Sequence, residues 1–542
     1  MATSLDTQDS PGVSAYVTYF LAAVIGLLVF YYYKKMTQGD EWIRLGVKCP
    51  RLSPFFFFGE DFRKSMSSLL DQYGDTFGTR SRFGVSLFTT NFDLLRHIFI
   101  KDFNNFVDRG SDIVSHSPFA ESLFFAKGSN WRRHRQIISP TFTSGKLKLI
   151  AKIIEKSAEN LTSHLERFAK NGETVPIKET TGRFTCEVIA KTGFGLDVSF
   201  IDEKESEFVD HAKKFLYNAH GLGRFIVQLL FFIHPTAFKL CNKVFRNTQL
   251  FDPVSLRSNE YFRTVLNTTV AQRRETRRQG ERKRHVDFLD LLLAANEAVK
   301  SGHLETATEE EDTAVSWKSK KALKELTDEE ILGHSMLIIF AGQETTATAL
   351  QMCLYSLACH QDIQDTVYQE IMSKVKSVPP SPDELTSLTY TECVLNETLR
   401  MYPPVPIVTR KAKETKTYNG VTIPKGAIVQ VPFFYILMDP KVWPEPDKFR
   451  PERFFPEEVE KRDPMAFVCF GHGPRICLGM RLAYLELKEA LVYIVRKLKV
   501  VLNDQTEPKR DVAKVEFTPQ GLLTPAKPIR LAFELRENAT NN

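Results

Sequence analysis

Near the C-terminus, residues 470–479 read FGHGPRICLG. The residues from 480 onward repeat apolar side chains at helical spacing, so we expect a loop that delivers Cys477 to the start of an amphipathic helix. Exposed backbone N–H groups and the positive end of a helix dipole lower the pKa of a thiol at such a place. The position therefore predicts a thiolate, the form of cysteine that binds iron.

Two glycines and an arginine surround this cysteine. Gly471 and Gly473 allow the backbone to turn tightly and to approach a flat ring closely. Arg475 can bind a carboxylate of such a ring through two parallel hydrogen bonds. The alternative is a buried cysteine in a glycine-rich turn, but the residue types together suit haem, whose two propionates are carboxylates.

At every fixed position the loop resembles the haem-binding signature of the cytochrome P-450 family, F-x-x-G-x-R-x-C-x-G. The resemblance implies haem b as the cofactor, Cys477 as the axial ligand to its iron, and Phe470 as part of the cofactor site. Thiolate ligation favours cleavage of the O–O bond, so it implies oxygen activation. The resemblance extends over nearly all of the chain after about residue 35.

A second motif, AGQETT at residues 341–346, is expected inside a long apolar helix. Gly342 costs a helix about 1 kcal/mol relative to alanine, so the cluster needs a reason, unless it is an ordinary solvent-facing turn. The resemblance implies that this helix crosses the distal face of haem, where Gly342 makes room for dioxygen and Thr345 hydrogen-bonds it. It implies that Glu344 helps to supply protons.

A third motif pairs Glu397 with Arg400, three residues apart in the stretch ETLR. On a surface helix such a pair contributes only about 0.2–0.5 kcal/mol. Downstream, residues 449–454 read FRPERF, and the family joins such a segment to its E-x-x-R helix. The resemblance thus implies a buried structural network of Glu397, Arg400 and Arg453.

Further cationic residues are assigned by the same resemblance. Two propionates in an apolar pocket need positively charged partners. Trp131 and Arg135 form a W-x-x-x-R pattern, for which an ordinary amphipathic helix is the alternative. The implied haem-propionate contacts are Trp131, Arg135, Arg109, Arg410 and Arg475.

The N-terminal part of the chain predicts a membrane anchor. Residues 13–33 are almost uncharged and long enough to cross a bilayer as a helix, whereas a cleaved signal peptide would be preceded by basic residues. Asp6 and Asp9 precede this span and Lys34 and Lys35 follow it, which places the N-terminus in the lumen and the remainder in the cytosol. We expect a luminal tail and anchor at residues 1–35, a hinge at 36–59 and a catalytic domain at 60–542, in the endoplasmic reticulum membrane.

The rest of the sequence predicts a fold that is mainly α with small β-sheets. Helical periodicity dominates, as at residues 146–168, and strand-like stretches are short, near 77–90, 411–431 and the C-terminal end. Thr327 and Glu330 form a capping box that predicts the start of the long apolar helix. The resemblance implies a cytochrome P-450 fold preceded by one transmembrane helix.

Composition limits the class of protein further. The chain has 542 residues, 43% of them hydrophobic, and no Gly/Ser-rich or Pro-rich linker, so one large globular domain is expected. Its net charge of +6 is small for this length and does not argue for nucleic acid as a partner. Eight cysteines without a C-x-x-C pair indicate neither a disulfide framework nor a zinc site.

The stretch SPTFTSGKLK at residues 139–148 resembles one subgroup of the family, which contains the drug- and steroid-oxidising animal microsomal enzymes and thromboxane synthase. The synthase rearranges an endoperoxide and lacks a hydroxyl at the position of Thr345. The retained Thr345 therefore favours a monooxygenase over an endoperoxide isomerase. A non-catalytic haem sensor would not need Glu344 and Thr345, and it is the third interpretation.

A monooxygenase inserts one atom of O2 into a lipophilic substrate, here a xenobiotic, a steroid or a fatty acid. The resemblance implies electrons from NADPH through cytochrome P-450 reductase, a flavoprotein, with membrane lipid as a further partner. Residues 225–238 are strongly apolar and are either a core helix or a membrane-dipping element at a channel mouth. The predicted walls of an apolar substrate pocket are Ile338, Phe340, Val405, Ile407 and Leu522.

Overall fold

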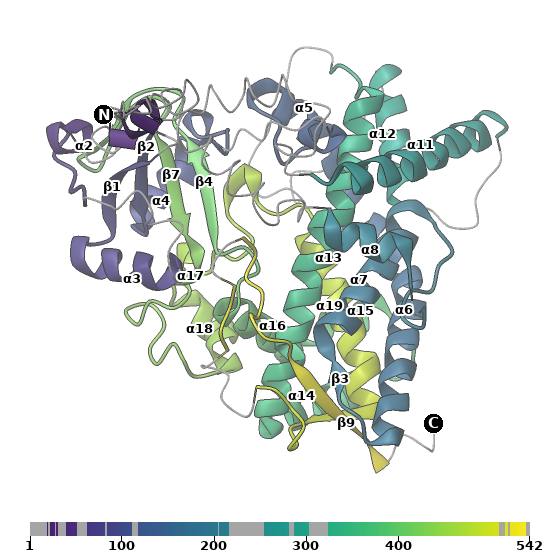
Figure 1. Cartoon of the computed structure of the whole chain (residues 1–542). Helices are drawn as coiled ribbons and strands as arrows, with labels where there is room; N and C mark the ends of the chain where they lie inside the picture. The colour runs from purple at the N-terminus through teal and green to yellow at the C-terminus, as the bar shows by residue number, and fades with distance from the viewer. Residues whose placement is uncertain are drawn as a thin grey trace, which may run out of the picture.

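Helices make up most of the described chain, and short strands form three small sheets within it (Figure 1). This arrangement agrees with the predicted mainly α fold. The computed structural model describes residues 19, 22–27, 29–30, 40–50, 62–81, 84–110, 117–203, 205–215, 254–280, 287–302, 323–508, 515–518 and 521–537.

Helices occur along most of the described sequence. The α-helices are α2 Asp40–Arg44, α3 Phe62–Tyr73, α4 Phe92–Arg96, α5 Gly128–Ile138, α6 Ser144–Asn171, α7 Ile177–Phe194, α8 Glu207–Lys214, α11 Leu256–Arg278, α12 Phe288–Lys300, α13 Asp328–Cys359, α14 Gln361–Lys374, α15 Pro382–Ser387, α16 Thr389–Met401, α17 Phe433–Ile436, α18 Pro456–Glu460 and α19 Met480–Lys497. Short helical turns that bear on the site are η1 His97–Lys101, η3 Pro118–Glu121, η5 Pro451–Phe454 and η7 Gly473–Arg475.

The long helix α13 runs through the middle of the molecule (Figure 1). It begins at the predicted capping box, in which the Thr327 side chain accepts a hydrogen bond from the Glu330 backbone N–H while Glu330 accepts one from the Thr327 backbone N–H. Most of its side chains are buried, because α7, η3, α16 and α19 surround it. A helix that is apolar on nearly all sides is typical of a position inside a large core.

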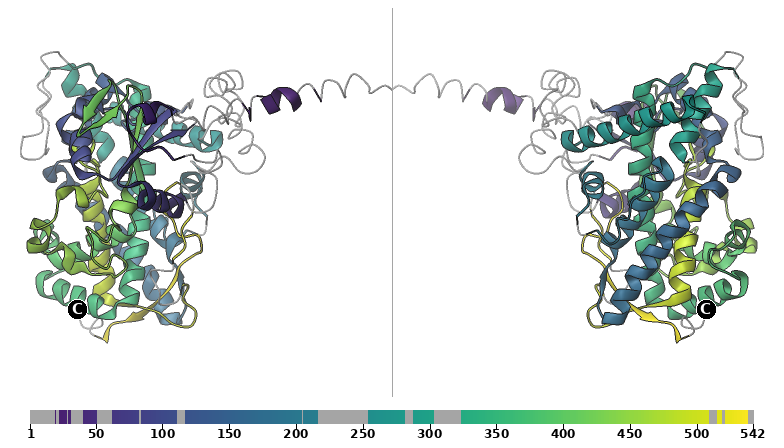
Figure 2. Two further views of the ribbon diagram at one scale, coloured as in Figure 1. Left: turned by 90° about the vertical axis from the view of Figure 1, so that its left-hand side faces the viewer. Right: turned by 90° about the vertical axis from the view of Figure 1, so that its right-hand side faces the viewer.

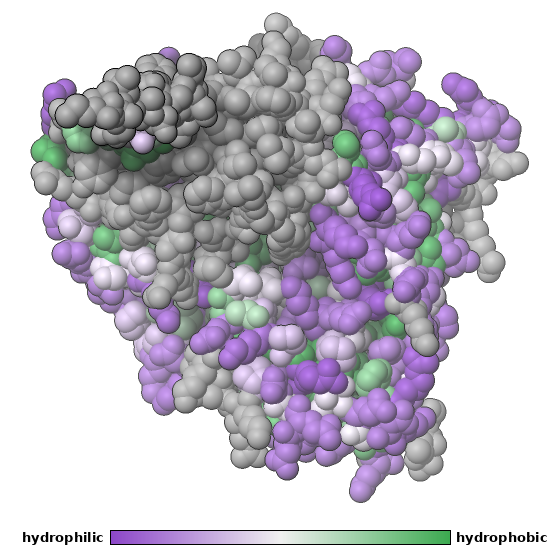
Figure 3. Space-filling model, in the orientation of Figure 1, coloured by the Kyte–Doolittle hydropathy of each residue, from purple (hydrophilic) through white to green (hydrophobic). Residues whose placement is uncertain are grey.

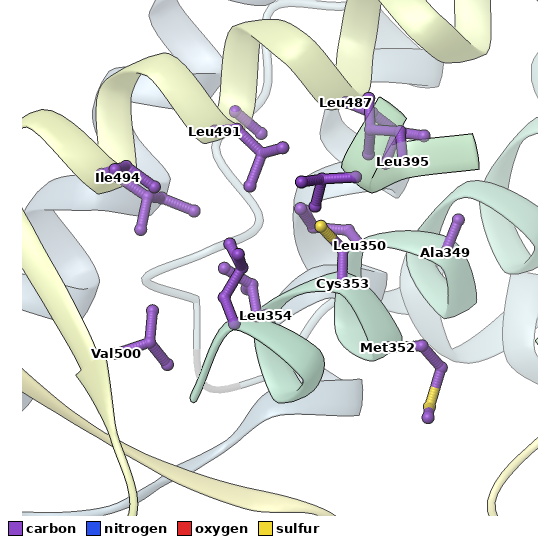
Figure 4. Packing of buried hydrophobic residues seen from close by; sticks show 14 of the residues in the cluster. Ala349, Leu350, Met352, Cys353, Leu354, Leu395, Leu487, Leu491, Ile494 and Val500 are labelled. Carbon is purple, nitrogen blue, oxygen red and sulfur yellow. The ribbon is translucent and has the colours of Figure 1, made fainter. Parts of the chain in front are cut away.

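The largest apolar core lies where α13 meets α16 and α19. Leu350 and Leu354 of α13, Leu395 of α16 and Leu491 of α19 are essentially inaccessible to solvent (Figure 4). Each leucine of this kind stabilises the fold by about 1.5–3 kcal/mol relative to an exposed one. Helix α6 also packs against α19 (Figure 2). The core thus fixes α19, the helix that follows Cys477.

Most strands lie in or beside the predicted regions, but the short strand at Val175–Pro176 was not predicted. The strands are β1 Thr76–Ser81, β2 Gly84–Thr89, β3 Val175–Pro176, β4 Ile407–Lys411, β5 Lys416–Tyr418, β6 Val421–Ile423, β7 Ile428–Pro432, β8 Leu498–Val501 and β9 Arg530–Leu535. The largest sheet has the order β1-β2-β7-β4, with β2 and β7 parallel and the other pairs antiparallel. Strand β4 carries Arg410 opposite Val429, so this sheet positions one of the predicted propionate contacts.

The outer surface of the body contrasts with its core. On the face shown in Figure 3 the described residues are mostly hydrophilic, and hydrophobic ones are scattered among them. Among the described residues there is no helix with the length and apolar character needed to span a bilayer. Of the predicted anchor at 13–33, residues 19, 22–27 and 29–30 are described as helical, and the others lie outside the described residues, as does the apolar stretch 225–238.

Glycine at position 333 sets how closely α13 approaches η3. A Cβ atom at Gly333 would lie 2.3 Å from the backbone oxygen of Pro118, which is too close for two such atoms. We expect Gly333→Ala to lower the free energy of unfolding by about 1–3 kcal/mol, because the backbone of η3 must move. The measurement is denaturant unfolding followed by circular dichroism.

A matched control is Gly182→Ala in α7, where a Cβ atom would meet nothing within 4 Å. Alanine favours a helix by up to about 1 kcal/mol over glycine, so this variant should be as stable as the parent or slightly more so. Equal destabilisation by both substitutions would show that the contact with η3 is not the cause.

Candidate haem-thiolate site

The loop that carries Cys477 is fixed by its own backbone. The Cys477 N–H donates to the Phe470 carbonyl over 2.9 Å, and the Gly471 N–H donates to the Val468 carbonyl over 2.7 Å. Gly471 and Gly473 have φ angles of +75° and +70°, a region that residues with a side chain rarely adopt. Helix α19 begins at Met480, directly after the loop, as the sequence predicts.

Gly473 meets a second requirement that the sequence does not reveal. A Cβ atom there would lie 1.8 Å from the backbone oxygen of Phe99, which belongs to η1. The close approach at this glycine is therefore made to another part of the chain. At Gly471 a Cβ atom would meet nothing within 4 Å, so its conformation alone requires glycine.

The thiol of Cys477 lies in an unusual environment. Burial raises its pKa, although the Gly479 N–H and the nearby Arg135 and Arg109 oppose this effect. The sequence predicted a lowered pKa at the helix start, and the protein alone does not achieve it because desolvation outweighs the helix terminus. The side chain is nevertheless accessible in the structure. A metal cation at the sulfur would favour the thiolate.

An arginine cluster near Cys477 shows whether the residues fit haem. Arg410 and Arg475 are buried, and the Nε atoms of Arg109, Arg410 and Arg475 have no hydrogen-bond partner in the described part of the chain. Burial and mutual repulsion lower the pKa of Arg475 to about 8 and that of Arg109 to about 10. A group with two carboxylates would supply the missing negative charge, so the residues fit haem.

Backbone and ring contacts hold this cluster against the Cys477 loop. Arg475 donates to the carbonyls of Ala126 over 2.7 Å and Phe124 over 3.4 Å, and its guanidinium lies 4.7 Å from the Trp131 ring centroid. Arg135 donates to the Ile476 carbonyl over 3.1 Å. The structure thus brings Trp131 and Arg135 of α5 together with the loop.

Helix α13 has one accessible face in an otherwise buried setting. Ile338, Ala341, Gly342 and Thr345 are accessible to different degrees, and their spacing places them on one side of the helix. The Thr345 hydroxyl donates to the Ala341 carbonyl over 2.7 Å. These four residues are therefore less buried than most of the helix.

The structure gives a different reason for glycine at position 342 than room for dioxygen. A Cβ atom there would lie 2.5 Å from Cδ1 of Ile189, which is on α7. Gly342 therefore allows α7 and α13 to pack closely. The sequence motif alone does not tell which neighbour needs this space.

Glu344 has partners that sequence reasoning missed. Its Oε1 atom lies 3.2 Å from Lys178 Nζ and 3.5 Å from the Thr524 hydroxyl, so segments far apart in the chain hold it. The Lys178 side chain is 42% exposed and that of Glu344 is 24% exposed, so water screens the pair and its contribution to stability is small. No signal in the sequence links these three residues.

The third motif forms a buried network that joins α16 to η5. Glu397 lies 2.7 Å from Arg400 Nε and 3.3 Å from Arg453 Nε, and all three side chains are almost completely buried. The remaining donors of Arg400 reach the carbonyls of Leu437 and Pro446 over 2.9 and 2.7 Å. Most of the polar groups of this network are therefore satisfied.

The predicted pocket residues fall into two groups. Ile338, Val405, Ile407 and Leu522 are partly accessible. Phe340 is buried and lies in an aromatic cluster, with its ring stacked on Phe215 and in edge contact with Phe119 and Phe262. Its side chain packs in the core and supports the accessible face of α13 indirectly.

The helical fold, the cysteine loop and the buried arginine cluster define a haem-thiolate enzyme. The family model described as Cytochrome P-450 matches residues 47–533, and the chain belongs to this family. Its cofactor is haem b, and it is a cytochrome P-450 monooxygenase.

The chain is also similar to curated animal enzymes of the drug- and steroid-oxidising microsomal subgroup. It is 30% identical to cytochrome P-450 3A27 of Oncorhynchus mykiss, over 98% of this chain and 97% of that relative. It is 31% identical to cytochrome P-450 3A29 of Sus scrofa, over 98% and 99%, and 32% identical to cytochrome P-450 3A11 of Mus musculus, over 96% and 97%.

Removing one member of the buried network should be far more costly than removing a similar residue beside it. We expect Arg453→Met to lower the free energy of unfolding by about 3–5 kcal/mol, because Glu397 keeps a buried charge with one partner fewer. Haem content per protein, read from absorbance, and denaturant unfolding are the measurements. The protein should incorporate little haem.

The control is Arg450→Met, three residues earlier. The Arg450 side chain is 50% exposed and pairs with Glu445 over 3.4 Å, while only its backbone N–H bonds Glu397. An exposed pair contributes about 0–1 kcal/mol, so this variant should keep its haem. Equal losses in both variants would contradict a special role for the network.

Proposed function

We propose that this protein is a membrane-anchored monooxygenase of the endoplasmic reticulum that takes electrons from NADPH through a flavoprotein reductase. It inserts one oxygen atom into a lipophilic substrate, a xenobiotic, a steroid or a fatty acid. The observation that carries the proposal is the polar pair Glu344 and Thr345 on the partly accessible face of α13, within a site otherwise built for a thiolate haem. A protein that only bound haem would not need this pair.

The residues that hold the cofactor divide the task between them. Cys477 would hold the haem iron, Phe470 and Trp131 would pack against the cofactor, and Arg109, Arg135, Arg410 and Arg475 would bind its two propionates. The Nε atoms of Arg109, Arg410 and Arg475 have no hydrogen-bond partner among the described residues, which supports this assignment. When bound, haem iron supplies the activation of dioxygen.

Proton delivery is assigned to Glu344 and Thr345. Lys178 and Thr524 hold the Glu344 carboxylate, and the Ala341 carbonyl accepts a hydrogen bond from the Thr345 hydroxyl and so orients it. Movement of Glu344 away from Lys178 would allow its carboxyl group to exchange protons with water. Thr345 would then pass a proton onward at the accessible face of α13.

The substrate site is assigned to four partly accessible apolar residues, which are Ile338, Val405, Ile407 and Leu522. Phe340 stays in the assignment as a residue that packs behind this face. Apolar walls of this kind bury a lipophilic molecule and orient it with few polar groups. They do not select among xenobiotics, steroids and fatty acids.

The membrane assignment rests on the N-terminal residues. Tyr19, Ile25, Leu27, Val29 and Phe30 expose between 44% and 70% of their surface, which water disfavours and lipid accepts. We therefore assign residues 1–35 to a luminal tail and a single-pass anchor, 36–59 to a hinge, and 60–542 to the cytosolic catalytic domain. The microsomal relatives support this location.

Cys477→Ser tests the ligand and the activity together. In microsomes, the reduced, carbon monoxide-bound parent should show a strongly red-shifted Soret band, and the variant should lack it because serine is a poor iron ligand. With reductase, NADPH and a panel of lipophilic substrates, only the parent should form oxygenated products. Conversion of an endoperoxide without NADPH, in the absence of oxygenation, would favour the isomerase interpretation instead.

Thr345→Val tests proton delivery, because valine keeps the shape of threonine and removes the hydroxyl. We expect the rate of product formation to fall about 100-fold, the low end of what a positioned proton-transfer group contributes. The red-shifted band should remain. Product formation by the purified variant with reductase is the measurement.

The matched control is Thr276→Val on α11, whose hydroxyl makes the same type of bond, to the Gln272 carbonyl over 3.0 Å, on the protein surface. This variant should turn over like the parent. A Thr345→Val variant that is fully active would remove the residue from the proposed pathway.

A further inference from the structure

Two buried histidines form a contact that the motifs above do not involve. His134 of α5 and His334 of α13 are 2% and 1% exposed. Their ring centroids lie 4.8 Å apart, and the ring planes are nearly perpendicular. The contact therefore joins the helix that carries Trp131 and Arg135 to the helix that carries Glu344 and Thr345.

Hydrogen bonds define the protonation of His334. Its Nδ1 atom accepts a hydrogen bond from the Leu123 backbone N–H over 3.1 Å, so this nitrogen carries no proton. The other ring nitrogen, Nε2, is buried and has no partner among the described residues. A protonated His334 would place an N–H group against the Leu123 N–H, and the bond would be lost.

His134 is engaged on one side only. Its Nε2 atom lies 3.0 Å from Glu330 Oε1 and 3.0 Å from Arg133 Nη2, and Arg133 also pairs with Glu330. Its Nδ1 atom is buried without a hydrogen-bond partner in the described structure. A proton on Nδ1 would therefore be a buried donor with nothing among the described residues to receive it, which is costly.

The charges around the pair also oppose protonation. The charged groups that face the two rings are Arg133 from α5 and Glu330 from α13, while the segment before α5 presents the Leu123 amide. Burial lowers the pKa of His334 well below its usual range, with further lowering by His134 and Arg133. Burial also lowers the pKa of His134, although Glu330 partly offsets this effect.

Both histidines hold segments that touch the Cys477 loop. His334 binds the Leu123 amide, and the carbonyls of Phe124 and Ala126, which follow in the chain, accept hydrogen bonds from Arg475. His134 precedes Arg135, which donates to the Ile476 carbonyl. Each of these two supports of the loop is thus tied to α13 through one histidine.

We propose that His334 and His134 are positioning residues that hold residues 122–126 and α5 against α13 only while both rings are uncharged. Protonation breaks the bond to Leu123, adds positive charge beside Arg133, and loosens both supports of the Cys477 loop. The haem site is therefore sensitive to mild acid. The inference rests on the proposed haem contacts of Arg475 and Arg135.

The direction of the pH effect follows from the lowered pKa values. The folded protein binds fewer protons at these histidines than the unfolded chain does, whose histidines titrate at about 6.5. Their contribution to stability is therefore fully present above about pH 6.5 and is lost as the pH falls below that value.

The test is an acid titration of the red-shifted carbon monoxide band in the full-length protein. His334→Gln is the decisive variant, because the glutamine oxygen can accept the Leu123 N–H but cannot take up a proton. The parent should lose the band as the pH falls below about 6.5, and the variant should lose it at a pH lower by at least about 0.5. His134→Leu, which removes the second titrating ring, should shift the midpoint in the same direction.

The control is His164→Gln, because burial lowers the pKa of His164 as well, but it lies on α6 beside Asp202. This variant should titrate like the parent. If His334→Gln and His134→Leu also titrate like the parent, the proposal is wrong. A parent that keeps its band down to about pH 4, below the ordinary titration of histidine, would also overturn it.

A second measurement needs no variant and no haem band. Hydrogen exchange in the parent at pH 7.5 and 5.5, corrected for the intrinsic rates, should show protection lost at residues 118–138 and retained in α14. Unchanged protection at 118–138 would overturn the proposal, even if the haem contacts were assigned wrongly. If acid lowers the exchange protection at residues 118–138 but leaves the red-shifted carbon monoxide band unchanged, the link between these residues and the Cys477 loop is refuted.

Discussion

The structure depends on buried positive charge that has no carboxylate ion-pair partner among the described residues. Arg109, Arg410 and Arg475 converge beside Cys477, and among the described residues none of them forms an ion pair with a carboxylate. Aromatic rings and backbone carbonyls support the guanidinium groups but cannot neutralise them. A cofactor with two carboxylates and a cationic metal would supply negative charge to the arginines and positive charge to the Cys477 sulfur. Its binding must therefore stabilise the fold.

This constraint explains why so many elements converge on one loop. Strand β4 supplies Arg410, α5 supplies Arg135, and η1 lies so close to Gly473 that only glycine fits there. Glu397 neutralises part of the charge of the buried Arg400 and Arg453. The apolar core fixes α19, the helix that follows the loop. Repulsion between arginines can be tolerated only on a framework whose other contacts are satisfied.

Local motifs predicted much of this site from the sequence. The loop around Cys477, the capping box at Thr327 and the mainly α fold follow from short patterns whose residues interact with near neighbours. The sequence did not reveal that Gly342 faces Ile189, that Phe340 packs in an aromatic cluster, or that Lys178 and His334 have the partners found here. These contacts join segments distant in the chain, and a single sequence carries no signal for them.

Helix α13 needs glycine at two positions because its different faces contact different neighbours. Gly333 lies against the backbone of Pro118, while Gly342, nine residues later and therefore on nearly the opposite side, lies against Ile189. The two close contacts fix the rotation of the helix about its axis from both sides. That rotation in turn decides that Thr345 lies on the accessible face while Phe340 points into the core. The glycines thus act on the site through geometry, although neither needs to touch a substrate.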